Sequence, residues 1–282
     1  MATKKIEYAI NYYMSLLKNR PRELFSYFLM KGYKCTTISS VHFNNLENVL
    51  NAKMYLGMLI TLIDDLADNP SCSNPNLSKI IYNNSTQKYN LSNNEKNIVK
   101  LKKFLFKNMM LSMKKLHNYD KLIDVFKFDL ENIYLANKYF ELVTNKYTIV
   151  NNYEIKLYGS YNMGIVAAGT IDLMGTKNIC YEEIGKCREI FIIAQKISKI
   201  ANTISTFSRE EYEGDITNEI SYLIKTYKNN FSFYKYKLEK DFLTGINLMK
   251  KSKNKIKNFN ILEYADGIQK LFELHMSLVG II

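Results

Sequence analysis

Three aspartates lie within five residues at the end of an apolar segment of the chain. Asp64, Asp65 and Asp68 follow residues 51–63, and Pro70 comes two positions after the last of them. On a helix Asp64 and Asp68 share one face, with Asp65 about 100° around from Asp64. Clustered carboxylates without a neighbouring His or Cys are the oxygen ligands that Mg²⁺ prefers, because Mg²⁺ completes its shell with water and phosphate oxygens. The segment predicts either a magnesium site or an exposed acidic helix end before a turn.

Three further oxygen-bearing side chains stand four residues apart in a second segment. Asn202, Thr206 and Glu210 occupy positions i, i+4 and i+8. Because four residues rotate a helix by only about 40°, an amide, a hydroxyl and a carboxylate line up over two turns of one face. The stripe is either an ordinary polar helix face or a second ligand set that holds Mg²⁺ opposite the aspartates.

Helices must carry both clusters, because apolar residues recur at spacings of three and four along most of the chain, as between Ile190 and Ile204. Only 11 Gly and 3 Pro occur in 282 residues, too few for the turns of a β-sandwich or barrel. Since no Gly-, Ser- or Pro-rich linker divides the chain, we predict an all-α helical bundle of nine to eleven helices, forming one domain over residues 1–282. Helix breaks are expected at residues 21, 69–76, 90–94, 151–152, 175–180 and 214–215.

The net charge of +12 raises the question of a polyanionic partner. Only four of the 39 basic residues are Arg, the side chain that binds phosphate in bidentate fashion. Unclustered Lys among abundant Asn, Ile and Tyr indicates a compositional bias and a solvated surface. We therefore predict no nucleic-acid partner. The alternative is a non-catalytic basic helical module that binds nucleic acid or a membrane surface.

Targeting and redox signals are sparse. The four cysteines form no C-x-x-C pair, and residues 1–8 lack the apolar core of a signal peptide. The apolar stretch 54–63 is ten residues long, whereas a bilayer span needs about 20. These features predict a cytoplasmic protein without stable membrane insertion. The histidines His42, His117 and His275 show no ligand spacing and are expected to be surface or core residues.

Together the two clusters resemble the metal motifs of class I terpene synthases, DDxxD and N-x-x-x-[ST]-x-x-x-E. Here these are residues 64–68 and 202–210, and residues 213–220 resemble the acidic-Gly-Asp-x-x-Asn turn that often follows. The resemblance implies a single α domain of the microbial type, for which homodimers are frequent. It also implies about three Mg²⁺ ions, with Mn²⁺ as the alternative metal. The ligands it implies are Asp64, Asp65, Asp68, Asn202, Thr206 and Glu210.

The same resemblance implies residues that bind the diphosphate of the substrate. Arg209 occupies the basic position before the final glutamate of the second motif. Lys156 stands in a segment similar to the family's broken helix, where an Arg is usual, and Gly159 and Ser160 are expected to mark the break. The family's C-terminal Arg-Tyr pair has no counterpart, because no Arg follows Arg209.

We therefore predict a class I terpene synthase that ionises and cyclises farnesyl or geranylgeranyl diphosphate, with release of diphosphate and formation of a sesquiterpene or diterpene. A prenyl-chain elongating or head-to-head condensing synthase is the alternative enzyme, and it would be expected to carry a second aspartate-rich motif. Positions one or two turns before the ligands are candidates for the pocket wall. These are Gly57, Ile60, Thr61, Gln195 and Ser198.

Overall fold

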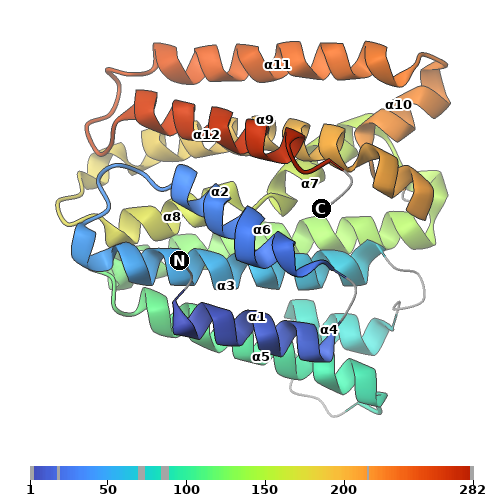
Figure 1. Ribbon diagram of the computed structural model, residues 1–282, viewed down its shortest axis with the longest axis horizontal. Coiled ribbons are helices and arrows are strands. Elements are labelled where there is room, and N and C mark those ends of the chain that lie inside the picture. Colours follow the sequence, from blue (N-terminus) through green and yellow to red (C-terminus); the bar gives the residue numbers. More distant parts are fainter. Residues whose placement is uncertain (1–2, 18–19, 69–73, 84–88, 215, 280–282) are drawn as a thin grey trace.

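The computed structural model describes residues 3–17, 20–68, 74–83, 89–214 and 216–279 (Figure 1). The α-helices within them are α1 (Lys4–Leu16), α2 (Met30–Cys35), α3 (Phe43–Asp68), α4 (Pro75–Asn83), α5 (Asn93–Met113), α6 (Tyr119–Asn145), α7 (Asn152–Asn162), α8 (Ile165–Gly175), α9 (Ile184–Glu213), α10 (Glu219–Tyr227), α11 (Phe231–Lys251) and α12 (Ile261–Met276). A π-helical stretch, η1 (Leu24–Leu29), precedes α2, and the 3₁₀ turns are η3 (Tyr147–Ile149) and η4 (Tyr181–Glu183). These ranges contain no strand, only an isolated bridge between Val41 and Thr176. The all-α prediction is confirmed.

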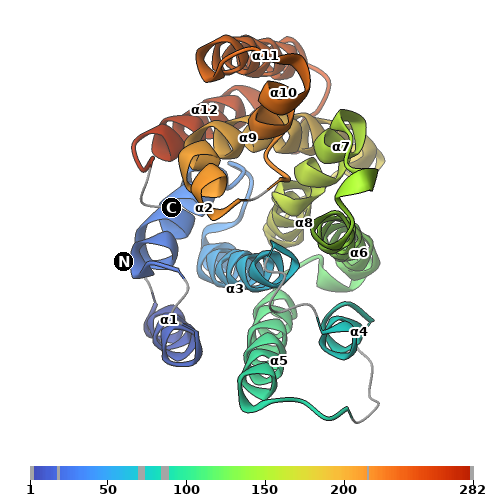
Figure 2. The same ribbon diagram turned by 90° about the vertical axis from the view of Figure 1, so that its right-hand side faces the viewer.

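Two long helices organise the bundle, α3 and α9. Helix α3 packs against α5, α6 and α8, while α9 packs against α7, α8, α11 and α12. Figure 2 shows α9, α11 and α12 on one side, α3, α6 and α8 in the middle, and α1, α4 and α5 on the other side. The two helices that carry the predicted ligand motifs therefore belong to neighbouring layers. That residues 1–282 form one domain stays a prediction.

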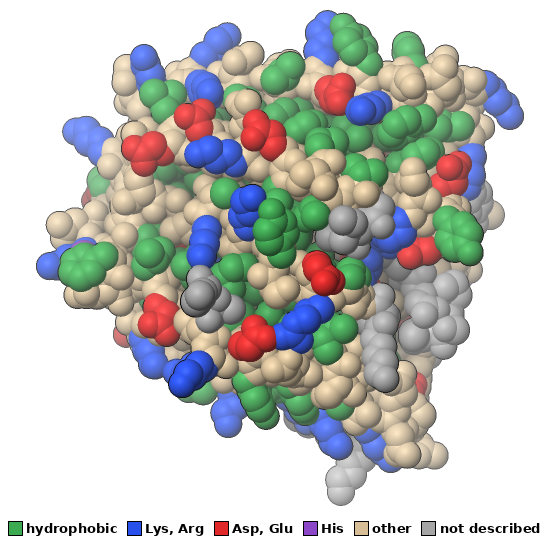
Figure 3. All heavy atoms as spheres, viewed as in Figure 1, with side chains coloured by type: hydrophobic (Ala, Val, Ile, Leu, Met, Phe, Trp, Pro, Cys, Tyr) green, Lys and Arg blue, Asp and Glu red, His purple; other side chains and the backbone are tan. Residues whose placement is uncertain are grey.

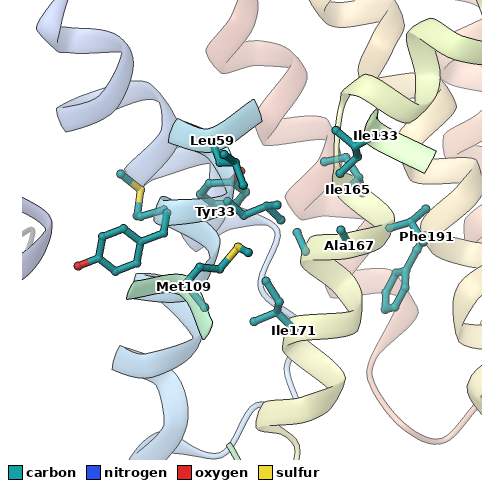
Figure 4. Close-up of a cluster of buried hydrophobic side chains, with 14 of the residues drawn as sticks. Tyr33, Leu59, Met109, Ile133, Ile165, Ala167, Ile171 and Phe191 are labelled. Atoms are coloured by element: carbon teal, nitrogen blue, oxygen red, sulfur yellow. The ribbon is translucent and has the colours of Figure 1, made fainter. Parts of the chain in front are cut away.

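The apolar periodicity of the sequence becomes the core of the bundle. All eleven residues of α8 are buried, because the helices around it cover every face. In Figure 4 side chains from α2, α3, α8 and α9, such as Tyr33, Leu59, Ile171 and Phe191, meet in one cluster. Burying such side chains contributes about 1.5–3 kcal/mol each relative to exposure, which fixes the mutual positions of α3 and α9.

The abundant asparagines have a structural use at helix starts. Asn151, Asn218, Asn230 and Asn260 are N-caps whose side-chain oxygens accept backbone N–H bonds at the starts of α7, α10, α11 and α12. Helix α5 starts with a capping box between Ser92 and Glu95. The breaks predicted at 90–94 and 151–152 are confirmed by these caps.

The chain has more helices than predicted, twelve α-helices in the described ranges instead of nine to eleven. One missed break lies at Lys228, which adopts a left-handed conformation with φ 63° between α10 and α11. Glycine is the usual residue for that conformation, so a lysine there gives no sequence signal. Another missed break, at Gly164, concerns the site and is described below.

Charge on the surface is mixed. On the face shown in Figure 3, Lys and Arg side chains are scattered and interleaved with Asp and Glu. This distribution agrees with the expectation of a solvated basic surface on that face. In the part of the chain that the structure describes, no helix has the length and apolarity that a membrane span requires.

Candidate active site

A cavity of about 180 Å³ lies among α2, α3, α7, α9 and α12. Its wall changes character along α3: Asp64 lines it near the end of the helix, and Ile60 and Gly57 line it one and two turns earlier. Further apolar wall residues are Phe28, Leu29, Tyr33, Phe140, Met163, Ile165 and Leu271. The cavity thus joins a charged region to a largely hydrocarbon-lined one.

The predicted wall positions divide between cavity and core. Gly57 and Thr61 line the cavity. A Cβ at Gly57 would lie 2.6 Å from the hydroxyl oxygen of Tyr33, so the glycine makes room for that ring. The Thr61 hydroxyl donates to the carbonyl of Gly57 at 3.0 Å, which occupies its proton. Gln195 is not part of the cavity lining: it is buried and accepts a bond from the N–H of Val166 at 3.1 Å.

Ser198 shares this position behind the wall. It is buried, its hydroxyl oxygen has no hydrogen-bond partner among the described residues, and it does not belong to the cavity lining. Two of the five wall candidates therefore face the core instead of the cavity.

The structure separates the side chains of Asp64 and Asp65. Asp64 lines the cavity, and its Oδ1 accepts a hydrogen bond from Nδ2 of Asn162. Asp65 instead faces Arg20, whose Nε donates to its Oδ1 at 2.7 Å, and Tyr13, whose hydroxyl lies 3.4 Å from its Oδ2. The side chain of Asp68, the last residue of α3, lies outside the described residues. Burial raises the pKa of Asp64, while the Arg20 guanidinium opposes that shift.

The second motif presents one continuous face to the cavity. Asn202, Thr206 and Glu210 all line it from α9. The hydroxyl of Thr206 donates to the carbonyl of Asn202 at 2.8 Å, so the lone pairs of its oxygen stay available. Glu210 is fixed by Nδ2 of Asn218, which donates to Oε2 at 2.6 Å. The predicted helical stripe therefore lines the same cavity as Asp64.

Three cationic side chains line the same cavity: Arg20, Lys199 and Arg209. Arg209 donates through Nη1 to Glu213 at 2.6 Å, and its buried Nε has no hydrogen-bond partner among the described residues. Lys199 donates through Nζ to Oδ1 of Asn202 at 3.0 Å. These cations could bind an anion next to the oxygen ligands.

Lys156 is not part of the cavity lining. Its side chain is half exposed on α7, and its Nζ lies 3.1 Å from Oε1 of Glu219 on α10. The structure therefore brings the ammonium of Lys156 to a carboxylate of α10 and not to the cavity, while its predicted role at the diphosphate stays a prediction. Lys199 is the lysine that the structure brings to the cavity, and its position three residues before Asn202 on one helix was a signal the sequence offered.

The helix break lies later than predicted. Gly159 and Ser160 are inside α7, and the chain turns at Met163 and Gly164, where Gly164 has φ 64° before α8 begins. Gly159 lines the cavity, and a Cβ there would lie 3.1 Å from Cε of Lys199. Ser160 is buried and donates to the carbonyl of Leu157 at 2.8 Å, without belonging to the lining. The left-handed conformation of Gly164, which a glycine adopts without strain, therefore separates α7 from α8.

The oxygen atoms around the cavity could supply part of the coordination shell of a metal ion, with water and phosphate completing it. Among the described residues, no three His, Cys, Asp or Glu side chains gather closely enough to hold a metal ion by themselves. The donors are the carboxylates of Asp64 and Glu210, the amide oxygen of Asn202 and the hydroxyl of Thr206. Such hard oxygen donors suit Mg²⁺ that keeps water and phosphate oxygens in its shell. The neighbouring cations suit those phosphates.

His275 of α12 also belongs to the cavity wall, which its sequence context did not indicate. It is 2% exposed, its Nδ1 lies 3.3 Å from Oγ of Ser205, and its ring packs edge-on against Phe28. Burial, together with the charge of Lys199, lowers the pKa of His275 to about 3 from its usual 6.5. The folded protein therefore holds a neutral imidazole here at all pH values above this pKa.

This shift predicts a loss of stability in mild acid. Below pH 6.5 the unfolded chain binds a proton at His275, whereas the folded chain does so only near pH 3, so stability falls as the pH falls from 6.5 toward 3. Urea unfolding should show that the stability difference between pH 7.5 and 5.5 is about 1.4 kcal/mol smaller in His275→Asn than in the wild type. An equal difference in both proteins would mean that His275 has the same pKa in the folded and the unfolded chain.

No family profile and no curated protein matches the sequence. Solved structures do match, and they show that the chain has the all-α fold of class I terpene synthases. Two of them are structures of isoprene synthase from leaves of the grey poplar, Populus x canescens. One is a complex with three Mg²⁺ ions and dimethylallyl-S-thiolodiphosphate, with a TM-score of 0.68 and 12% identity over 97% of this chain and 53% of the other.

The second isoprene synthase structure gives a TM-score of 0.61 and 14% identity over 96% of this chain and 54% of the other. The chain therefore spans about half the length of the solved structures it matches. At these identities the likeness shows the fold alone. The chemistry has to be argued from the side chains of the cavity.

Proposed function

We propose that this protein is a class I terpene synthase that ionises a linear prenyl diphosphate, farnesyl or geranylgeranyl diphosphate, and cyclises it with release of diphosphate. One observation carries the proposal: Asp64 from α3 and the stripe Asn202, Thr206 and Glu210 from α9 line one cavity that also has cationic side chains and an apolar region. A prenyl diphosphate has the matching chemistry, a polyanionic head and a hydrocarbon tail. One isoprene synthase structure of the same fold contains three Mg²⁺ ions and dimethylallyl-S-thiolodiphosphate. This complex supports a prenyl diphosphate as the class of ligand.

The charged part of the cavity would hold the leaving group. Mg²⁺ bound there acts as a Lewis acid that stabilises the charge developing on the diphosphate oxygens. Lys199 and Arg209 would bind the same oxygens directly, and the buried, unpartnered Nε of Arg209 is a donor that a phosphate oxygen would satisfy. Arg20 lines the cavity as well, beside Asp65. These groups favour separation of the allylic carbon from its oxygen.

The apolar part of the cavity would fold the hydrocarbon and keep water from the carbocation. The rings of Phe28, Tyr33 and Phe140 line it, and a π face turned toward a desolvated cation would stabilise that cation by about 2 kcal/mol. The hydroxyl of Thr61 is engaged by a backbone carbonyl and offers no free proton. Exclusion of water protects the cation from premature capture.

Several finer features belong to the same proposal. The metals would be three Mg²⁺ ions, with Mn²⁺ as a substitute, and Asp65 and Asp68 would join the ligand set when the metals and the diphosphate are bound. The protein would act in the cytoplasm, as one domain, and as a homodimer. Size-exclusion chromatography with light scattering measures the last of these.

The test is incubation of purified protein with Mg²⁺ and prenyl diphosphates from C5 to C25, followed by gas chromatography and mass spectrometry of headspace and extract. The C5 member is included because the structural neighbour binds a dimethylallyl compound. A cyclic hydrocarbon or alcohol from the C15 or C20 substrate, abolished by EDTA, supports the proposal. Folded protein that yields no product from any member overturns it.

Replacement of Lys199 should show whether the cations that line the cavity bind the prenyl diphosphate. Lys199→Met removes a cationic donor from the cavity, so we expect KM for the prenyl diphosphate to rise about 10- to 100-fold, as for loss of a charged hydrogen bond. Lys156→Met is the matched control, and its KM should stay within about twofold because Lys156 faces Glu219. A larger effect at Lys156 than at Lys199 would show that Lys156 is the lysine that binds the diphosphate.

A further inference from the structure

A chain of side-chain amides lies behind Asp64 and connects three helices. Asn162, the last residue of α7, lines the cavity and donates through Nδ2 to Oδ1 of Asp64. Its own oxygen accepts a bond of 2.7 Å from Nδ2 of Asn137 on α6, which also donates to the carbonyl of Ile133 at 2.9 Å. Helix α6 packs against both α3 and α7, and Figure 2 shows α7 directly beside it.

Each bond in this chain fixes the direction of the next one. An amide group donates only through nitrogen and accepts only through oxygen. Asn137 uses both of its protons, on the Ile133 carbonyl and on Asn162, so the oxygen of Asn162 is occupied and its nitrogen has to point toward Asp64. The direction of the last bond is thereby set by a residue that does not touch the cavity.

Asn137 is a polar residue in a fully buried position. Its side chain is 0% exposed, and its Oδ1 has no hydrogen-bond partner among the described residues. A buried carbonyl without a partner is unfavourable, and a leucine of similar size would avoid that penalty. The bond from Asn137 to Asn162 gives a reason for a polar residue here, because functional sites are where proteins keep such unfavourable groups.

A competing cation explains why Asp64 needs such a support. Nη2 of Arg20 lies 4.0 Å from Oδ2 of Asp64 and 2.6 Å from Oδ1 of Asp65. Arg20 therefore pairs closely with Asp65 and only at long range with Asp64, and its charge attracts the Asp64 carboxylate. The bond from Asn162 holds Oδ1 of Asp64 and so opposes a movement of this carboxylate toward Arg20.

We propose that Asn162 is a positioning residue for the metal-binding carboxylate of Asp64, and that Asn137 is the anchor that orients Asn162. This inference rests on the proposed function, because it takes Asp64 to be a Mg²⁺ ligand. It also gives the helix break a second use: the turn at Met163 and Gly164 ends α7 at the residue that reaches Asp64.

The experiment measures metal binding separately from stability and turnover. The probe is Mn²⁺ with inorganic diphosphate, and free Mn²⁺ is followed by electron paramagnetic resonance in wild type, Asn137→Leu and Asn162→Ala. Loss of such an outer contact lowers metal affinity by about 10- to 100-fold. We expect both variants to bind Mn²⁺ at least tenfold more weakly, while the urea midpoint of Asn137→Leu equals or exceeds that of the wild type.

A control and a double variant sharpen the test. Asn108 of α5 makes the same type of bond, from Nδ2 to the carbonyl four residues earlier at 2.8 Å, so Asn108→Leu should leave Mn²⁺ affinity within twofold. The double variant Asn137→Leu/Asn162→Ala should bind no more weakly than Asn162→Ala alone, because both act through one bond to Asp64.

The possible outcomes separate this inference from the proposed function. Wild-type affinity in both single variants overturns the positioning role, as does weaker binding that follows a loss of stability in Asn137→Leu. Weakened Mn²⁺ binding in a protein that converts no prenyl diphosphate keeps the positioning role and overturns the proposed reaction. A wild-type protein that binds no Mn²⁺ with diphosphate overturns both.

Discussion

Replacement of Glu210 by glutamine is expected to lower the rate of product formation from a prenyl diphosphate by about a thousandfold. Glu210 is one of two carboxylates among the described residues of the cavity wall, and Asn218 fixes it at 2.6 Å. Glutamine keeps the size of the side chain and an oxygen that Asn218 can contact. The variant therefore loses the negative charge that attracts a divalent cation, while its shape is retained. Gas chromatography at rising Mg²⁺ concentrations measures the loss.

The next residue along α9 supplies the control. Glu211 carries the same charge but is exposed on another face of the helix, so Glu211→Gln should retain activity within about twofold. Circular dichroism should be the same for both variants and the wild type. If Glu210→Gln kept more than a tenth of the wild-type rate, the stripe on α9 would not be a metal site.

Features that depend on one helix alone could be predicted from the sequence. The positions of Asn202, Thr206 and Glu210 on one face follow from helix geometry, and the structure brings all three to the cavity. The same geometry places Asp65 around the helix from Asp64, and Asp65 indeed faces Arg20 instead of the cavity. Local periodicity fixed these directions because no distant contact is needed to define them.

Features that depend on contacts between helices could not be predicted from the sequence. The sequence predicts that Lys156 binds the diphosphate. In the structure its ammonium contacts Glu219 instead of lining the cavity, because α7 packs against α10. Arg20 lies far from Asp64 in the sequence and meets it only because η1 and α2 pack on α3. Partner choice across tens of residues has no local signature.

The end of α7 is a third case, because two glycines there, Gly159 and Gly164, have different structural roles. Gly159 stays helical and leaves room for Lys199, whereas Gly164 adopts φ 64° and ends the helix. Both uses of glycine are common, and its presence alone does not distinguish close packing from a change in backbone direction. The break predicted at Gly159 and Ser160 was therefore wrong by about one helical turn.

The largest effect on stability is expected at a buried ion pair behind the cavity. Nζ of Lys53 lies 2.9 Å from Oδ1 and 3.0 Å from Oδ2 of Asp172, and both side chains are fully buried. Lys53 also donates to Oγ1 of Thr37 at 3.0 Å, and Asp172 accepts from the N–H of Ile38 at 3.2 Å. The pair therefore joins α3 and α8 to the chain that follows α2. Thr36 in that segment lines the cavity.

Lys53→Met removes the cation and leaves a buried carboxylate, so we expect the free energy of unfolding to fall by about 3–5 kcal/mol at pH 7.5 in urea titrations. Burial already raises the pKa of Asp172 to about 6 with Lys53 present, and loss of Lys53 raises it further. The folded variant then binds a proton that the unfolded chain releases above about pH 4, so its stability should rise as the pH falls from 7.5 to 5.5.

Two comparisons separate the buried charge from packing. The double variant Lys53→Met/Asp172→Asn leaves no charge, and its asparagine can still accept the Ile38 N–H bond, so its stability should return to within about 1.5 kcal/mol of the wild type. The exposed pair of Lys127 and Asp124 has a similar 2.8 Å contact, and Lys127→Met should change stability by less than about 0.5 kcal/mol. If the double variant were as unstable as Lys53→Met alone, side-chain shape at Lys53 and not an unpaired Asp172 would account for the loss.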